Sequence, residues 1–419
     1  MKEDKTVPQL RFPEFTDAWK QRKLREVVKE FYNGQTPYRQ NKAYWGGNVN
    51  WLTSGDLNRD VVTNTIEKIT EEGQKASRLR IIPKETLVIA IMGLEAAGTR
   101  GNCGILGIDT TINQACMALI ANESIATKDF LFQWYKAFGN RLALKFTQGT
   151  KQQNYNEELL GNLDISYPSL KEQQQIGAFF TQLDNTITLQ QRKLNSLQKL
   201  KKGLLQKMFP KNGENIPEIR FPEFSDAWKQ RELGEIAERV TRRNSSLESQ
   251  TPLTISAEYG LIDQNKFFGK RIAAKDLSNY YLIQKGEFAY NKSTSNDAPW
   301  GAIKRLDCYN NGALSTLYIV FKIKDNKSCY SDFLVTYYGT SLWHKEVKEI
   351  ASEGARNHGL LNVSPSDFFR TKLVIPQDFE EQRKIGAFFT QLDNTITLQQ
   401  RKLESLQKLK KGLLQQMFI

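Results

Sequence analysis

The sequence has few of the residues that bind metals or form disulfides. It contains 4 cysteines and 2 histidines among 419 residues. None of them forms a CxxC pair, an HExxH motif or a zinc-finger spacing, so we expect neither a zinc site nor any other metal centre. We interpret Cys103, Cys116, Cys308 and Cys329 as buried or free thiols in a reducing cytoplasm.

Long hydrophobic runs are also missing. No stretch of about 18 apolar residues is present to span a membrane, and the polar segment Met1–Arg11 lacks the apolar core of a secretory signal. We therefore expect a cytoplasmic protein without a membrane segment.

Short catalytic motifs are absent as well. The sequence has no GxxxxGK[ST] phosphate loop, no GxSxG elbow and no Pro-Pro dipeptide of the kind found in DNA methyltransferase motifs. Asp297–Trp300 (DAPW) comes near to such a motif, but Ala298 replaces the first proline and we interpret the segment as a turn. The sequence therefore predicts no catalytic residues, although scattered carboxylates could still form an unfamiliar active site.

Positive charge is in excess. Lys and Arg number 59 against 46 Asp and Glu, a formal net charge of +13. This favours a polyanionic partner, nucleic acid first. The alternative is a soluble protein whose basic charge is incidental.

Two long segments of the chain are nearly identical. Residues 176–209 and 385–418 agree at 32 of 34 positions, at an offset of 209. At the same offset, residues 8–24 (PQLRFPEFTDAWKQRKL) correspond to residues 217–233 (PEIRFPEFSDAWKQREL). The intervening residues show no similarity that can be aligned. We infer one scaffold, used twice, that carries two different binding blocks.

The repeated segments have the heptad pattern of long helices. Apolar residues recur in steps of four and three from Ile176 to Met208 and from Ile385 to Met417. Each helix would be roughly 50 Å long. Lys201 and Lys410 interrupt this apolar seam, as do Gln190 and Gln399. They are either tolerated surface polarity or, as we favour, residues that control the register of the helices, because a buried polar residue must meet a partner. Leu200 and Leu205 widen the stripe, which suits packing by a further helix from another protein.

These patterns predict an α+β protein with two globular domains, one for each variable block, joined by two long antiparallel helices in a pseudo-two-fold repeat. Stacking of the repeats by translation is the alternative. The predicted divisions are a first repeat segment (1–24), block 1 (25–168), a long helix (169–211), a second repeat segment (212–233), block 2 (234–376) and a second long helix (377–419). Within the blocks, short apolar runs such as Leu87–Met92 and Lys372–Ile375 predict strands, and Lys128–Lys145 predicts a helix.

Polar and basic residues cluster between the predicted strands. Arg and Lys neutralise phosphates, and Asn, Gln and Arg can read base edges. The candidate DNA-binding residues of block 1 are Tyr38, Arg39, Lys42, Trp45, Lys75, Arg78, Arg100, Asn102, Gln148, Thr150, Lys151, Gln153 and Asn154. Those of block 2 are Arg242, Arg243, Asn244, Lys270, Lys292, Ser293, Asn296, Lys304, Arg356, Asn357 and His358. For any one of them a solvated surface position is the alternative.

The whole chain resembles the specificity subunit of type I restriction–modification systems. The resemblance depends on the segments Arg11–Trp19 and Arg220–Trp228, the two variable blocks and the twin helices. It implies a non-catalytic DNA reader in which block 1 and block 2 are two target recognition domains, each of which binds one half of an asymmetric bipartite site. It further implies methyltransferase and restriction/translocase subunits as partners, which would bind S-adenosylmethionine, ATP and Mg²⁺. A self-contained methyltransferase or nuclease and a coiled-coil adaptor are the alternatives.

Overall fold

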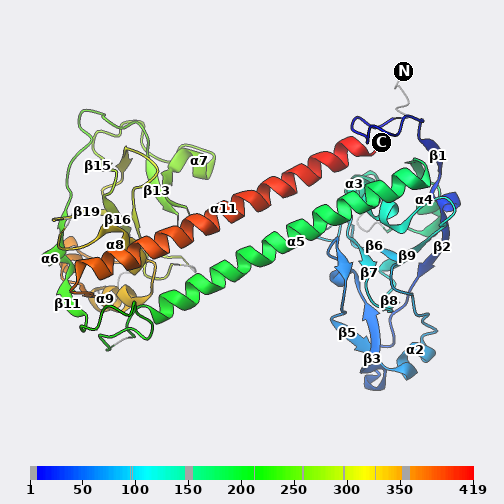
Figure 1. The fold of residues 1–419 in the computed structure, drawn as a ribbon, viewed down its shortest axis with the longest axis horizontal. Helices are drawn as coiled ribbons and strands as arrows, with labels where there is room; N and C mark the ends of the chain where they lie inside the picture. The colour runs from blue at the N-terminus through cyan, green and yellow to red at the C-terminus, as the bar shows by residue number, and fades with distance from the viewer. Residues whose placement is uncertain are drawn as a thin grey trace. The chain divides into compact units, whose positions relative to one another are not determined.

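The computed structural model describes residues 7–94, 96, 98–146, 154–211, 213–256, 259–295, 298–325, 327–351 and 359–419. They form two compact units (Figure 1). Unit 1 comprises residues 1–192 and 401–419, and unit 2 comprises residues 193–400. Two long helices, α5 (Leu170–Lys207) and α11 (Phe379–Met417), each begin in one unit and end in the other. Both begin six residues before the near-identical repeats, which start at Ile176 and Ile385.

Unit 1 contains block 1, which is built on a five-stranded sheet with the order β2-β9-β6-β7-β4. The strands are β2 (Val28–Asn33), β4 (Val61–Val62), β6 (Leu87–Ala90), β7 (Cys103–Leu106) and β9 (Cys116–Ala121). A three-stranded sheet of β3 (Trp45–Leu52), β5 (Glu67–Ile69) and β8 (Thr111–Ile112) extends the block. The helices are α1 (Leu24–Val27), α2 (Glu71–Ala76), α3 (Lys128–Phe146) and α4 (Glu157–Gly161), with 3-10 turns at Lys42–Tyr44 (η1) and Ser54–Asp56 (η2).

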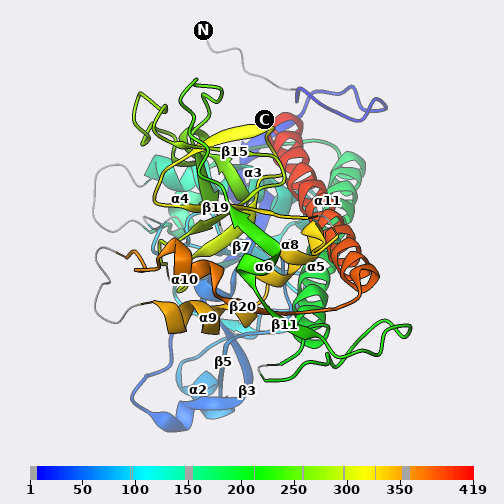
Figure 2. The ribbon, with the colours of Figure 1, turned by 90° about the vertical axis from the view of Figure 1, so that its left-hand side faces the viewer.

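Unit 2 contains block 2, whose main sheet has the order β12-β19-β16-β17 (Figure 2). Its strands are β12 (Ala237–Arg239), β16 (Phe288–Asn291), β17 (Ala302–Arg305) and β19 (Ile319–Ile323). Two separate antiparallel strand pairs accompany it: β13 (Leu253–Ser256) with β14 (Gly260–Asp263), and β15 (Tyr281–Gln284) with β18 (Asn311–Leu314). The helices are α6 (Leu233–Ile236), α7 (Gln264–Phe268), α8 (Ser331–Tyr338), α9 (Leu342–Ile350) and α10 (Pro365–Phe369).

The main sheets of the two blocks have the same topology, although the sequences of the blocks show no similarity. In block 1, Leu87 of β6 pairs with Leu119 of β9 and with Ile105 of β7. In block 2, Phe288 of β16 pairs with Phe321 of β19 and with Arg305 of β17. All these pairs are antiparallel, so β2, β9, β6 and β7 correspond in order and direction to β12, β19, β16 and β17.

A short antiparallel strand pair closes each block. In unit 1, β1 (Lys20–Lys23) pairs with β10 (Asp164–Tyr167), and in unit 2, β11 (Lys229–Glu232) pairs with β20 (Lys372–Ile375). The helix before the last strand is capped in both cases. Asn156 accepts a hydrogen bond from the Leu159 amide, and Ser364 accepts one from the Asp367 amide. These caps fix where the chain leaves each block for its long helix.

Each unit has a core of aromatic rings to which the end of a long helix contributes. In unit 1, Phe418 lies against Trp19, Phe130 and Phe180, with ring centroids 5.5–6.2 Å apart. In unit 2, Phe209 packs in the same way against Trp228, Phe333 and Phe389, at 5.6–6.4 Å. The core of each unit therefore depends on the helix that begins in the other unit.

Ion pairs show that α5 and α11 are antiparallel. Asp184, in the first half of α5, pairs with Lys410, near the end of α11. In unit 2, Lys201 near the end of α5 pairs with Asp393 in the first half of α11, with 2.5 Å between Nζ and Oδ1. Each unit thus holds the start of one helix against the end of the other, as predicted, and the translational alternative is excluded.

Candidate DNA interface

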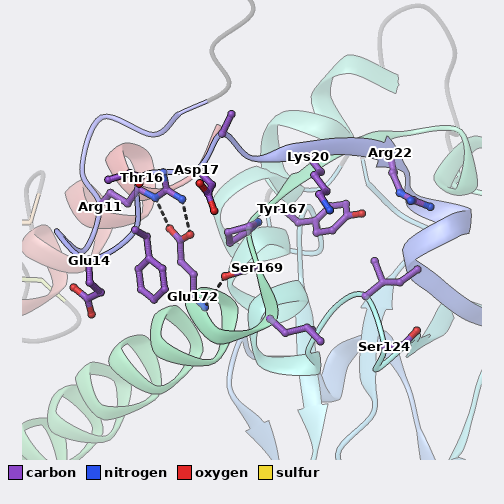
Figure 3. A pocket seen from close by; sticks show the side chains of 15 residues that line it. Arg11, Glu14, Thr16, Asp17, Lys20, Arg22, Ser124, Tyr167, Ser169 and Glu172 are labelled. Carbon is purple, nitrogen blue, oxygen red and sulfur yellow. Dashed lines mark hydrogen bonds and ion pairs between the residues drawn. The ribbon is translucent and has the colours of Figure 1, made fainter.

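The repeated RFPEF segment is held to its long helix by a buried ion pair. Nε and Nη2 of Arg11 each donate to a carboxylate oxygen of Glu172 at 2.7 Å (Figure 3). Trp19 Nε1 donates to the same carboxylate at 3.4 Å. The Glu172 side chain is 1% exposed. Its hydrogen bond is the largest of the effects that raise the pKa of Arg11. This contact fixes the segment at the first turn of α5.

The second copy of this contact is the same. Arg220 donates to Glu381 at 2.6 and 2.7 Å, and Trp228 donates to it at 3.2 Å. The sequence comparison missed this role of the two glutamates, although both lie at the repeat offset, four residues before Ile176 and Ile385. Their repetition was the signal that could have revealed them.

The lysines that interrupt the heptad seam each pair with an aspartate of the other long helix, Lys410 with Asp184 and Lys201 with Asp393. They have partners as expected, although Lys201 and Asp393 are 31% and 48% exposed. In unit 1 a third residue joins Asp184 and Lys410: Lys136 of α3 donates to Asp184 at 2.7 Å. Burial, and then the charge of Lys410, lower the pKa of Lys136 to about 8. Block 1 is thereby attached to both long helices at one carboxylate.

In unit 2 the corresponding lysine is Lys304, on β17, which the sequence suggested as a DNA contact. Burial lowers its pKa first, and the charge of Lys201 lowers it further while Asp393 opposes this. Lys304 thus lies in the electric field of the helix–helix ion pair. Like the pKa of Lys136, its pKa is lowered by burial and by a lysine of the helix pair, although Lys304 comes from a strand and not from a helix.

The structure brings one group of predicted residues of block 1 together. Arg39 stacks on Trp45, with its guanidinium carbon 3.9 Å from the ring centroid, and makes a bidentate ion pair with Glu67 at 2.5 and 2.9 Å. Trp45 Nε1 donates to the carbonyl of Tyr38, whose own side chain is 64% exposed. The exposed Lys42 lies in η1 beside them.

Helix α2 and the turn that follows it add two more cations to this group. It packs on η1, and Gly73 lies so close that an added Cβ would be 2.7 Å from the Tyr44 carbonyl oxygen. Lys75 is exposed, and its Nζ lies 3.7 Å from Glu71 Oε2. Arg78 is also exposed and has a backbone φ of 51°. Tyr38, Arg39, Lys42, Trp45, Lys75 and Arg78 thus form one small surface, which we call the block 1 tip.

Other predicted residues of block 1 lie elsewhere. Arg100 Nε donates to the Leu94 carbonyl at 2.9 Å, and Asn102 Nδ2 donates to the Gly98 carbonyl at 2.6 Å. Both are therefore used inside their own loop. Asn154 is exposed. The remaining four, Gln148, Thr150, Lys151 and Gln153, lie outside the described residues.

In block 2 the predicted run Arg242–Asn244 supports the fold. Asn244 is 0% exposed, and its side chain is hydrogen-bonded to the backbone of Ser249 and Leu277. The prediction that Asn244 contacts DNA is therefore wrong, because its side chain faces the interior. Arg242 pairs with Glu287 at 3.0 Å. Arg243 donates to the carbonyl of Asn279 at 2.6 Å.

The other predicted residues of block 2 are dispersed. Lys270 is exposed, just after α7. Lys292 donates to the Val363 carbonyl at 3.4 Å, and Ser293 forms an isolated bridge with Leu360. Asn296, Arg356, Asn357 and His358 lie outside the described residues. Sequence clustering therefore did not distinguish surface cations from cations that stabilise turns. It also assigned to loops residues that lie in regular elements, such as Lys75 of α2 and Lys304 of β17.

Within the described ranges, no group of three or more His, Cys, Asp or Glu residues is placed to hold a metal ion. The same ranges contain no helix long and apolar enough to cross a membrane. The structure contains two domains with the same main sheet topology. Each domain carries its own loops, and each is attached to the duplicated long helices.

The comparisons with known proteins agree with this class of duplicated, two-domain DNA reader. The model of the type I restriction modification DNA specificity domain matches residues 16–199 and again residues 225–408. The chain belongs to this family, and it carries two copies of the domain.

Among relatives, the chain is similar to the type I restriction enzyme MjaIX specificity subunit of Methanocaldococcus jannaschii, with 27% identity over 228 residues. That match spans about half of either chain, 52% of this one and 51% of the relative. Similarity to the putative type I restriction enzyme MjaX specificity subunit of the same organism is 23% and covers 96% of this chain and 93% of the relative. Both relatives are named as specificity subunits of type I restriction enzymes.

Solved structures share the fold. The S subunit of the type I restriction–modification system from M. genitalium superimposes with a TM-score of 0.62 over 99% of both chains, at 15% identity. A chain from a study of assembly of the type I R-M system gives a TM-score of 0.53 at 18% identity and covers 96% of this chain and 97% of that one.

Proposed function

We propose that this chain is the DNA-specificity subunit of a type I restriction–modification complex and that it recognises an asymmetric bipartite site. The observation that carries the proposal is the shared sheet of the two blocks. The order β2-β9-β6-β7 recurs as β12-β19-β16-β17, but block 1 adds the β5-β3-β8 sheet and block 2 adds β13-β14 and β15-β18. One scaffold with unlike additions suits two readers that recognise different half-sites.

The long helices offer a surface for protein partners. Leu189 and Leu200 on α5 are 64% and 52% exposed, and the equivalent Leu398 and Leu409 on α11 are 70% and 52% exposed. Eleven residues separate the members of each pair, about three helical turns, so both leucines lie on one face. We propose that methyltransferase subunits pack on this leucine flank, and that restriction/translocase subunits join the complex.

We assign the catalytic reactions of the complex to these partners. S-adenosylmethionine, ATP and Mg²⁺ would be bound by the methyltransferase and translocase subunits, and this chain would supply the sequence that they act on. The complex would work in the cytoplasm, which suits a chain whose four cysteines form no disulfide.

A reconstitution experiment tests the proposal. The chain should show no methyl transfer alone and should direct methylation to one selected sequence when it is assembled with methyltransferase subunits. If about eight phosphates are contacted, the logarithm of the affinity should fall with the logarithm of salt at a slope near −7. Methyl transfer by the chain alone would support a self-contained enzyme, and the absence of salt-sensitive DNA binding by the complex would support an adaptor.

A further inference from the structure

The two blocks build different structures in the segment between the first and second strands of their common sheet. In block 1 this segment, residues 34–86, joins β2 to β6 and forms β3, β4, β5, α2 and the block 1 tip. In block 2 the equivalent segment, residues 240–287, joins β12 to β16 and forms β13, β14, α7 and β15. Segments that vary on a constant scaffold are the usual place for specific contacts with a ligand.

Helix α7, in this segment of block 2, presents two aromatic rings to the solvent. Phe267 and Phe268 are 47% and 46% exposed, and their ring centroids lie 4.9 Å apart with an angle of 82° between the ring planes. Tyr259 and Ile272, on either side of them in the sequence, are also exposed. Large apolar side chains are often exposed singly, but their grouping on a folded domain indicates a binding surface.

The chain around these rings is held in place by its own hydrogen bonds. Asp263 accepts one from the Asn265 amide at 2.9 Å where α7 begins, and Gly269 ends the helix with a φ of 64°. Arg271 then donates to the carbonyl oxygen of Lys275 at 2.9 Å. Arg271 is therefore used inside its own loop, and the two rings are presented by a fixed turn.

The same segment is strongly basic. Residues 264–275 (QNKFFGKRIAAK) contain four cations and no Asp or Glu. Lys266, Lys270 and Lys275 are exposed. The ion pairs that the structure describes in block 2 use other cations, namely Arg242, Arg305, Lys322 and Lys345. The three lysines are thus available to a negatively charged ligand.

Lysines around exposed rings favour DNA over a protein as this ligand. Lysine is depleted in the cores of protein–protein interfaces, whereas DNA-binding wedges combine apolar side chains with cations that neutralise phosphates. The block 1 tip has the same chemistry at the equivalent place in the sheet, where Arg39 stacks on Trp45 beside the exposed Tyr38. Within unit 2, α7 lies well away from β11 and α9, through which block 2 is joined to the helical frame (Figure 1).

We propose that Phe267 and Phe268 are specificity-determining residues of block 2, which contact the bases of its half-site through their exposed rings. Phenylalanine makes such contacts with the methyl group of thymine and with base steps that it opens. The three lysines bind the phosphates beside these bases and position the rings without reading sequence. This inference rests on the proposed function, since block 2 has a half-site only if the chain reads DNA.

The test of the rings uses the complex reconstituted with methyltransferase subunits and the selection of sites from a random duplex library. Phe267→Ala/Phe268→Ala should relax the base preference at one or more positions of one half-site, by on the order of tenfold. The other half-site, which block 1 reads, should be unchanged. Thermal unfolding of the variant should match that of the unaltered chain, because the lost rings are exposed.

The lysines should behave differently from the rings. Lys266→Gln/Lys270→Gln should weaken binding to every sequence and make the slope of log affinity against log salt less steep by about 0.9 for each phosphate contact removed. The base preferences should be kept. Lys348→Gln/Lys372→Gln is the matched control, since it removes the same charge from exposed positions on α9 and β20. The control should leave the slope as it was.

Phe388→Ala controls for the loss of an exposed ring elsewhere. Phe388 is 37% exposed but lies on α11, so this variant should select the same two half-sites as the unaltered complex. Unchanged selection by the Phe267→Ala/Phe268→Ala complex would overturn the inference and leave the proposed function intact. Failure of that variant to assemble with methyltransferase subunits would also overturn it, because the rings would then bind a protein. Absence of any half-site selection by the unaltered complex would refute the proposed function itself.

Discussion

At the scale of single residues, buried charges organise this protein more than the loop cations do. Arg11 and Glu172 are 10% and 1% exposed at the side chain, and Arg220 and Glu381 are 12% and 0% exposed. Removing one partner of such a pair leaves an uncompensated charge in a low-dielectric surrounding. The two pairs therefore secure the repeat segments to the helices.

Glu172→Gln should lower the free energy of unfolding of unit 1 by about 3 kcal/mol, because it leaves the Arg11 guanidinium buried without its carboxylate. Urea unfolding of the full chain, followed by the fluorescence of tryptophan, measures the change. Glu380→Gln is the control: Glu380 and Arg383 form an ion pair that is 55% and 50% exposed, so the control should cost less than about 1 kcal/mol. Equal effects of the two changes would contradict a special role for the buried pair.

Sequence patterns had limited power at this scale. The repeats marked Arg11 and Trp19 as part of a frame, but not their shared contact with Glu172, because periodicity does not say which carboxylate a guanidinium meets. The same limit applies to Arg242 and Asn244, which have the composition of DNA contacts and are used to hold Glu287 and a turn.

At the scale of elements, the long helices could be predicted from the sequence, but how closely other helices pack against them could not. Heptad periodicity identified both helices and their polar interruptions. Two glycines near their beginnings permit close packing that no heptad count reveals. A Cβ added at Gly177 would be 2.8 Å from Asp129 Cβ, and one added at Gly386 would be 2.6 Å from the Phe333 amide nitrogen. α3 and α8 therefore cross the long helices at backbone contact.

Gly386→Ala should destabilise unit 2, because the atoms that it would meet belong to the backbone of α8 and cannot rotate away. The overpacking cost of roughly 1–3 kcal/mol exceeds the gain of about 1 kcal/mol in helix propensity. Gly412→Ala in the same helix meets nothing within 4 Å and should stabilise the protein by about 0.5–1 kcal/mol. Thermal unfolding compares the two variants, and stabilisation by both would show that the approach at Gly386 is not close.

At the scale of the whole molecule, one frame carries two recognition blocks. Each block enters and leaves the frame through a strand pair, β1–β10 or β11–β20. Since the main sheets correspond strand for strand, a block of the same topology from another family member should fit the same entry and exit strands. The frame would then keep its aromatic cores around Phe209 and Phe418.

Exchange of residues 234–376 for the equivalent block of a relative should change one half-site of the recognised DNA and leave the other as it was. Selection of binding sites from a random duplex library by the reconstituted complex measures both half-sites at once. Alteration of both would show that the blocks do not read independently. A return exchange of the original block, which should restore the original site, controls for damage to the frame.

The sequence by itself determined the duplication, the two long helices, the shortage of metal and cofactor motifs and the family, because repeats, periodicity and composition are local properties of the chain. Tertiary structure decided which long helix completes which core. The ends of α5 and α11 are nearly identical, so the sequence offers no preference between them. A straight helix of 38 residues, about 57 Å long, carries Phe209 away from the block before it, and Phe418 of the other helix fills that place. Tertiary structure also gave two blocks of dissimilar sequence the same sheet topology. Strand order depends on which hydrophobic faces meet and not on residue identity.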